Sequence, residues 1–197
     1  MAFASMAGKI KVLNTRHPMI KGMVSYALLW PCGSAIQQVM EGKTLETFDW
    51  KRCFRFGVYG AFVVAPMLHG WVRLSSTMWP ATSLKIGLIK AAVEQVSYGP
   101  FAMSCFYIGM NLLEFKSLED GIHELQHKFW PTFKTGICVW PIVQTINFSM
   151  IPERNRVVFV SIISVLWTTY LAYMKSLDDT KVLQSTPLTA VLKTELN

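Results

Sequence analysis

The chain has 197 residues, of which 52% are hydrophobic and only 16% are charged, and its net charge is +7. This length suits a single domain, and the charged fraction lies well below the quarter or so that is usual in soluble domains. The Lys and Arg residues are spread over the chain rather than gathered in one stripe, so no nucleic-acid partner is expected.

Five stretches without Asp, Glu, Lys or Arg follow one another along the chain. They are 17 to 19 residues long and cover residues 22–40, 56–72, 95–113, 135–152 and 157–174. A helix that crosses a bilayer needs about 20 predominantly apolar residues. The sequence therefore predicts an all-α fold, a polytopic transmembrane helix bundle with four to five spans. A soluble all-α protein with unusually apolar helices is the less favoured alternative.

The predicted spans lie between two polar ends. Residues 1–21 form a basic N-terminal lead-in without any acidic residue, a composition compatible with mitochondrial import. The His17-Pro18 pair at its end predicts the start of the first helix. Residues 22–176 are interpreted as an integral membrane helical domain, and residues 177–197 as a polar C-terminal tail. From Lys175 onward the chain is expected to be loosely ordered.

Between the third and fourth predicted spans, residues 117–130 are charged and periodic. Ile122, Leu125 and Phe129 share one face at helical spacing. This pattern predicts a short amphipathic helix that lies along the membrane surface.

The same segment contains HELQH at residues 123–127, which fits the zinc-protease pattern H-E-x-x-H. A protease of that kind needs His123 and His127 as ligands, Glu124 as base and a third protein ligand nearby. Few acidic residues follow, so we interpret the match as accidental and keep a zinc metalloprotease only as a distant third hypothesis. No metal site, no cofactor and no enzymatic activity are expected, since Gly-rich nucleotide loops and a G-x-S-x-G serine motif are also absent.

The four cysteines form no C-x-x-C pair, which argues against a disulfide framework and against a thiolate metal site. They are Cys32, Cys53, Cys105 and Cys138. We expect them to be buried, inert thiols.

Several polar side chains fall inside the apolar stretches, where they normally face the bundle interior or water. The candidates for a pore lining or a functional polar group are His69, Glu94, Gln95, Gln38, Gln144 and Asn147. Hydrogen bonding between helices is the simpler interpretation of the three amides Gln38, Gln144 and Asn147. Glu94 is either a pore-lining or proton-sensitive group or a member of a local ion pair, with Lys90 or His69 as its expected partner.

Two predicted spans contain a Trp-Pro pair with an amide on the same helical face. Trp30, Ser34 and Gln38 share a face in the first span, as do Trp140, Gln144 and Asn147 in the fourth. Proline bends a helix and frees a backbone carbonyl, which polar neighbours must then satisfy.

The C-terminal half carries a specific resemblance. WPIVQTINFSMIPERNRV at 140–157 and VLWTTYLAYMKS at 165–176 resemble the pattern of the Mpv-seventeen / twenty-two-kilodalton peroxisomal membrane protein family. The matching residues include Trp140, Pro141, Gln144, Asn147, Phe148, Pro152, Arg156, Trp167 and Tyr170. Upstream blocks match through residues that include His69, Gln95 and Gln38, whereas Ser34 stands where the family has an aspartate.

The resemblance implies an integral, multi-pass protein of the mitochondrial inner membrane or, as an alternative, of the peroxisomal membrane. It further implies a role in solute permeability, in metabolite and redox homeostasis and in mitochondrial DNA maintenance. We therefore expect a channel or solute pathway, with a non-conducting membrane scaffold as the alternative. The expected partners are the lipid bilayer, small solutes or ions, and a second copy of the chain in a homo-oligomer.

Overall fold

The computed structural model describes residues 18–80, 83–150 and 153–185, without the side chains of residues 18, 147–149, 153–158, 161 and 178–185. Every regular element in these ranges is a helix, which confirms the all-α prediction. The elements are α2 (Pro18–Met40), α3 (Trp50–Tyr59), the π-helical segment η1 (Gly60–Val64), α4 (Ala65–Met78), α5 (Leu84–Val96), α6 (Tyr98–Leu113), α7 (Leu118–Ser149) and α8 (Glu153–Ser185).

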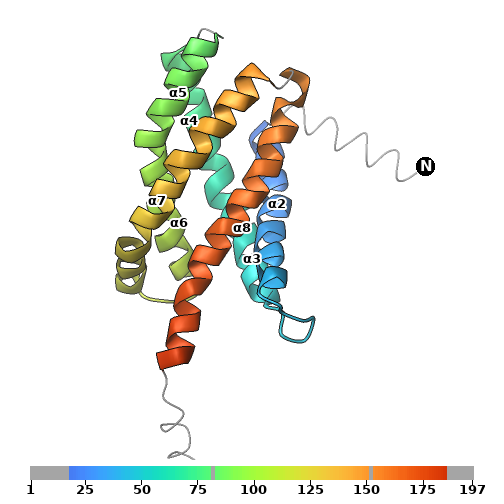
Figure 1. Cartoon of the computed structure of the whole chain (residues 1–197), viewed down its shortest axis with the longest axis vertical. Coiled ribbons are helices and arrows are strands. Elements are labelled where there is room, and N and C mark those ends of the chain that lie inside the picture. The colour runs from blue at the N-terminus through green and yellow to red at the C-terminus, as the bar shows by residue number, and fades with distance from the viewer. Residues whose placement is uncertain (1–17, 81–82, 151–152, 186–197) are drawn as a thin grey trace, which may run out of the picture.

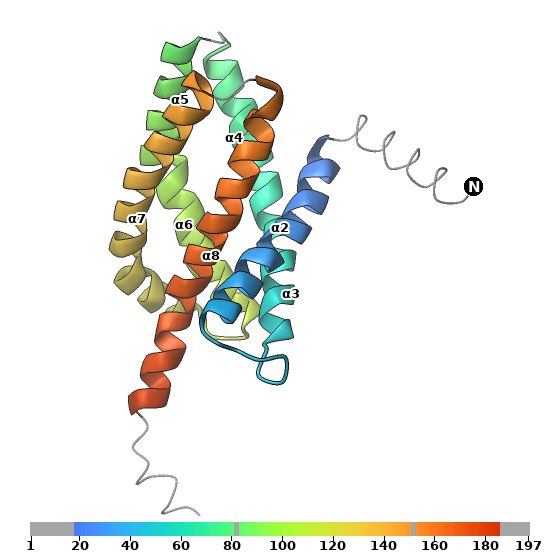
Figure 2. The same ribbon diagram turned by 45° about the vertical axis from the view of Figure 1, so that its right-hand side comes forward.

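The helices form an elongated bundle (Figure 1). α8 runs between α2 and α7, and it packs most extensively against α2, while α6 packs most extensively against α7. In the second view the C-terminal part of α8 extends below the other helices (Figure 2). The chain segment between α2 and α3 and the connection from α6 to α7 lie at this same end, which we call the α8 end of the bundle.

Aromatic rings from three helices fill the core. Trp30 of α2, Phe56 and Tyr59 of α3 and Phe106 of α6 are buried, with ring centroids 5.5 to 6.0 Å apart. Large aromatic side chains remove much apolar surface from their surroundings and prefer tilted or edge-to-face contacts such as these.

A glycine allows α2 and α8 to approach each other closely. A Cβ placed on Gly33 would lie only 2.7 Å from Cβ of Thr168 and 3.0 Å from the backbone nitrogen of Thr169. A larger residue at this position would therefore force the two helices apart.

The third predicted span is not one continuous helix. α5 ends at Val96, and Ser97 leaves helical geometry with φ −116° and ψ −70° before α6 begins at Tyr98. Pro100 explains the break, because proline has no N–H to donate and its ring clashes with the carbonyl group four residues earlier.

The prediction of a separate surface helix at 117–130 is wrong. A capping box between Ser117 and Asp120 starts α7, and this helix continues through Pro131 and Pro141 to Ser149. Leu125 and Phe129 pack against the hydrophobic core. These two residues of the predicted apolar face therefore reflect packing on neighbouring helices, whereas the third, Ile122, is exposed.

α8 also continues beyond the point where the sequence suggested loose order, running past Lys175 to Ser185. The division into lead-in, membrane domain and tail stays a prediction, and residues 1–17 and 186–197 lie outside the described part of the chain. None of the helices in the described ranges combines the length and the apolar composition that crossing a membrane requires.

Candidate functional site

A cavity of about 370 Å³ lies inside the bundle, and every helix of the described chain contributes to its wall. Three of the predicted polar residues line it together, namely Glu94 and Gln95 from α5 and Gln144 from α7. The rest of the wall is largely apolar, and its aromatic side chains include Tyr26, Trp30, Tyr98, Phe106, Trp140 and Trp167. The tertiary structure thus brings an acid and two amides into one apolar chamber.

Glu94 is held by a partner that the sequence did not suggest. Its carboxylate accepts a hydrogen bond of 2.9 Å from Nε1 of Trp71, whose indole stacks on Tyr98 at 5.3 Å and 17°. Neither Lys90 nor His69, the expected partners of Glu94, takes part in this hydrogen bond. His69 and Trp71 project from different faces of α4, because side chains two positions apart in a helix are rotated by about 200° around its axis. Accordingly Trp71 reaches α5, and His69 is not among the residues that line the cavity.

The predicted shared face of Trp140 and Gln144 is confirmed, because both side chains line the cavity. Trp140 makes an edge-to-face contact with Trp167 of α8 at 5.8 Å. The Tyr170 hydroxyl lies 3.0 Å from Oγ1 of Thr135. These aromatic residues therefore join α7 to α8 on one side of the chamber.

Some residues of the family pattern cannot be placed. The side chains of Asn147, Phe148 and Arg156 and the whole of Pro152 lie outside the described part of the chain. Pro141 is inside α7 and exposed, and the Thr145 hydroxyl donates a hydrogen bond of 2.7 Å to its carbonyl oxygen.

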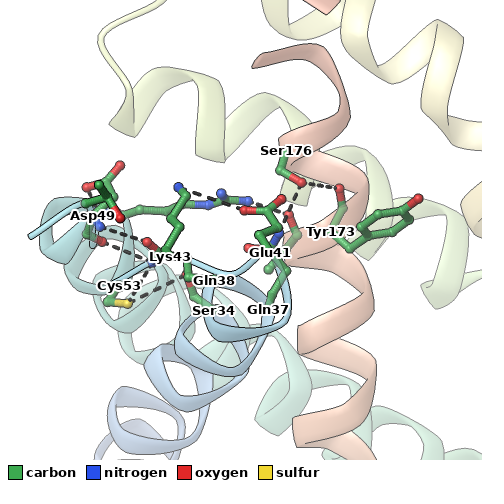
Figure 3. Close-up of polar contacts among 12 residues, drawn as sticks. Ser34, Gln37, Gln38, Glu41, Lys43, Asp49, Cys53, Tyr173 and Ser176 are labelled. Carbon is green, nitrogen blue, oxygen red and sulfur yellow. Dashed lines mark hydrogen bonds and ion pairs between the residues drawn. The ribbon is translucent and has the colours of Figure 1, made fainter. Parts of the chain in front are cut away.

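Gln38 lies apart from the cavity, in a polar cluster at the α8 end of the bundle (Figure 3). Its amide nitrogen donates to the Asp49 carbonyl oxygen at 3.2 Å, and its amide oxygen accepts from the Asp49 backbone N–H at 2.8 Å. Cys53 and Ser34 lie beside the same amide, and Trp30, Ser34 and Gln38 are all buried as their shared face predicts. This pairing holds α2 against the start of α3. Gln38 thus makes the hydrogen bonds between helices that were the simpler interpretation of this amide.

α8 receives two further polar contacts in this region. The Gln37 amide donates to the Ser176 hydroxyl at 3.2 Å, and the buried Arg52 guanidinium donates to the Ala172 carbonyl oxygen. Both bonds tie α8 to the α2–α3 side of the bundle.

A cluster of buried charges, which we call the Glu124 cluster, holds the other side of α8. Its members are Asn111, Glu114, Glu124, Lys128 and Lys175. The Glu124 carboxylate pairs with the Lys128 ammonium group at 2.8 Å and with the Lys175 ammonium group, and it accepts a hydrogen bond from the Asn111 amide. Burial alone would raise the pKa of Glu124, but Lys175 and Lys128 outweigh burial and hold this pKa below its ordinary value.

Sequence reasoning missed this cluster. The one local signal is the spacing of Glu124 and Lys128, which puts opposite charges one helical turn apart. The contribution of Lys175 could not be seen locally, because Lys175 lies 51 residues further along the chain.

The structure separates the members of the HELQH motif. Glu124 is buried in its ion pairs, whereas His123 and His127 are exposed with their Nε2 atoms 3.2 Å apart. Within the described ranges, no group of three or more His, Cys, Asp and Glu side chains could hold a metal ion. The geometry of a zinc protease is therefore not assembled around these residues.

The cysteines are only partly as expected. All four are free thiols, and Cys53 is buried, while Cys105 is half-buried. Cys32 and Cys138 are exposed, so the expected burial is wrong for these two.

Comparisons with known protein sequences identify the family. The profile of the Mpv17 / PMP22 family matches residues 111–172. An Mpv17-like protein from Xenopus laevis is 32% identical over 85% of this chain and 81% of its own length. PXMP2/4 family protein 4 from Dictyostelium discoideum is 32% identical over 82% of this chain and 88% of its own.

The chain belongs to the Mpv17 / PMP22 family. A more distant relative, Protein SYM1 from Saccharomyces cerevisiae, is 26% identical over 82% of this chain and 85% of its own. No solved structure matches the chain. The family profile includes Asn111, Glu114, Glu124 and Lys128 of the Glu124 cluster but ends before Lys175, and it spans the contact between Trp140 and Trp167. Membership of the Mpv17 / PMP22 family supports a membrane protein of the mitochondrion or the peroxisome.

Proposed function

We propose that the chain is a multi-pass protein of the mitochondrial inner membrane in which the central cavity forms part of a pathway for small polar solutes or ions. The peroxisomal membrane is the alternative location. Through such a pathway the protein would contribute to metabolite and redox homeostasis and to the maintenance of mitochondrial DNA, without catalysing a reaction.

The distribution of side chains supports the membrane part of this proposal. Large apolar side chains are exposed on the outer faces of most helices, including Leu28, Phe62, Phe101, Ile142 and Leu166. Four charged side chains are buried, namely Arg52, Glu124, Lys128 and Lys175. Monomeric soluble proteins rarely expose so many large apolar side chains, whereas polar groups of membrane proteins face the bundle interior.

The observation that carries the pathway is the placement of Glu94, Gln95 and Gln144 around one chamber. Inside an apolar bundle such groups are energetically expensive unless they bind each other, water or a solute. The chamber is large enough to hold several water molecules or one small solute. The Trp71 hydrogen bond fixes the Glu94 carboxylate at its wall.

Single-channel recording of the purified protein in planar bilayers tests the proposal. We expect discrete conductance in the wild type and an altered unitary conductance or ion selectivity in Glu94→Gln. Glu119→Gln removes an exposed carboxylate at the start of α7 and is the matched control, since this residue does not line the cavity. His69→Ala should also leave the conductance unchanged, because His69 does not line the cavity either.

A non-conducting scaffold is the second candidate function. The hydrogen bonds between Gln38 and Asp49 and the Glu124 cluster favour it, because these polar groups hold helices together. A folded and correctly inserted sample without any conductance would support the scaffold and contradict the pathway.

A further inference from the structure

Two histidines form a close pair on the exposed face of α7. His123 and His127 are one helical turn apart, with ring centroids separated by 4.4 Å and Nε2 atoms by 3.2 Å. The residues that follow each of them, Glu124 and Lys128, are directed into the bundle and buried. The two imidazoles are therefore presented to the surroundings, while the helix beneath them is anchored by buried ion pairs.

The spacing of the two nitrogen atoms matches a shared metal ion. Imidazole nitrogen binds zinc at about 2.0–2.1 Å, and an ion at that distance from both atoms would form an N–metal–N angle of about 100°. This angle lies between the right angle of octahedral geometry and the tetrahedral angle. The two nitrogen atoms are thus close enough to contact one ion.

We propose that His123 and His127 form a two-point binding site for a late first-row divalent cation, of which Cu²⁺ and Zn²⁺ are the prime candidates. Imidazole is a favoured ligand for both ions, and their affinities for such sites lie near the top of the divalent series. Water would occupy the remaining coordination positions. The carboxylate of Asp120, which interacts electrostatically with His123, adds favourable negative charge beside the pair.

This site is neither a protease centre nor part of the solute pathway. Glu124 is engaged by Lys128 and Lys175 and so is not available as a general base for metal-bound water. The two histidines do not line the central cavity. The inference is therefore independent of the proposed function.

The metal would replace the existing contact between the rings. At 3.2 Å, one ring donates its Nε2–H to the other ring's Nε2. For both Nε2 atoms to bind a cation, the donating ring must carry its proton on Nδ1 instead.

Isothermal titration of the full-length protein in detergent with Cu²⁺, and separately with Zn²⁺, tests the site after alkylation of the free thiols. We expect one ion per chain, and at least a tenfold loss of the association constant in His123→Gln and in His127→Gln. The association constant of the double variant should be no lower than that of either single variant, because removing one histidine already abolishes binding by two ligands. His69→Gln is the matched control and should bind as the wild type does.

Electron paramagnetic resonance of the Cu²⁺ complex gives a second readout, which should show two coordinated nitrogens in the wild type and at most one in each single variant. Wild-type affinity in both single variants would overturn the proposal. So would additive losses, which indicate two independent histidines, or the absence of binding by the wild type at millimolar metal.

Discussion

Glu124 lies under the surface of the bundle with two ammonium groups and an amide around its carboxylate. Breaking a buried ion pair by removing one partner leaves an uncompensated charge and typically costs about 3–5 kcal/mol. We therefore expect Glu124→Gln to lower the free energy of unfolding by about 3 kcal/mol, which thermal unfolding in detergent would show as a lower midpoint. Glu119→Gln, five residues earlier and on the exposed face of the helix, should leave the midpoint nearly unchanged. Equal midpoints for both variants would contradict a stabilising role of the cluster.

The same carboxylate predicts a pH dependence. The pKa of Glu124 is lower in the folded protein than its ordinary value of about 4.3. Its stabilising contribution is therefore fully present above the ordinary pKa and is lost as the pH falls through the lower, folded pKa. Unfolding of wild type and Glu124→Gln between pH 7 and pH 3 should give a stability difference that is constant near neutrality and shrinks at the acidic end. A difference that grows on acidification would contradict the direction of the shift.

At the scale of helices, two glycines give opposite predictions for the same substitution. Gly33 faces Thr168 of α8 at a distance that leaves no room for a Cβ, whereas a Cβ on Gly70 of α4 would meet nothing within 4 Å. Gly33→Ala should lower the free energy of unfolding by about 1–3 kcal/mol, because it overfills the contact between α2 and α8. Gly70→Ala should raise it by about 0.5–1 kcal/mol, because alanine is the better helix former. Thermal unfolding of the two variants side by side checks both signs.

Element boundaries could be predicted where local chemistry alone sets them. The start of α2 at Pro18 follows from the His17-Pro18 pair. Two other predictions failed because they depended on distant partners. The charged segment 117–130 belongs to a long helix, since Leu125 and Phe129 have a core to pack on. α8 continues past Lys175, since ion pairs fix that residue to Glu114, directly after α6, and to Glu124 of α7.

For the whole molecule, the exposed apolar surface predicts which positions lipid covers. In a cysteine-free background, Phe62→Cys replaces an exposed side chain in the middle of the bundle, and Leu45→Cys replaces one in the segment between α2 and α3. We expect a charged, water-soluble maleimide to label Leu45→Cys and to leave Phe62→Cys unlabelled in intact membranes. In denaturing detergent both should be labelled, which controls for the presence of each thiol. Equal labelling of the two variants in membranes would contradict the membrane-embedded bundle.

Part of the candidate site could be predicted from the sequence, without knowledge of how the helices pack. Glu94, Gln95 and Gln144 stand out as polar residues in apolar surroundings, and helical spacing places Trp140 and Gln144 on one face. That Gln38 belongs to another cluster could not be predicted, because its partner Asp49 is reached only after the chain reverses between α2 and α3.

By itself, the sequence determined the helical class, the resemblance to the family and the faces that single helices present, because these depend on the order and spacing of nearby residues. Only the tertiary structure decided that Trp71 holds Glu94, that Lys175 reaches Glu124 and that α7 continues through two prolines. The physical reason is that burial and charge pairing arise between helices. The energy of a polar group is set by the neighbours that packing brings to it, however far away they lie in the chain.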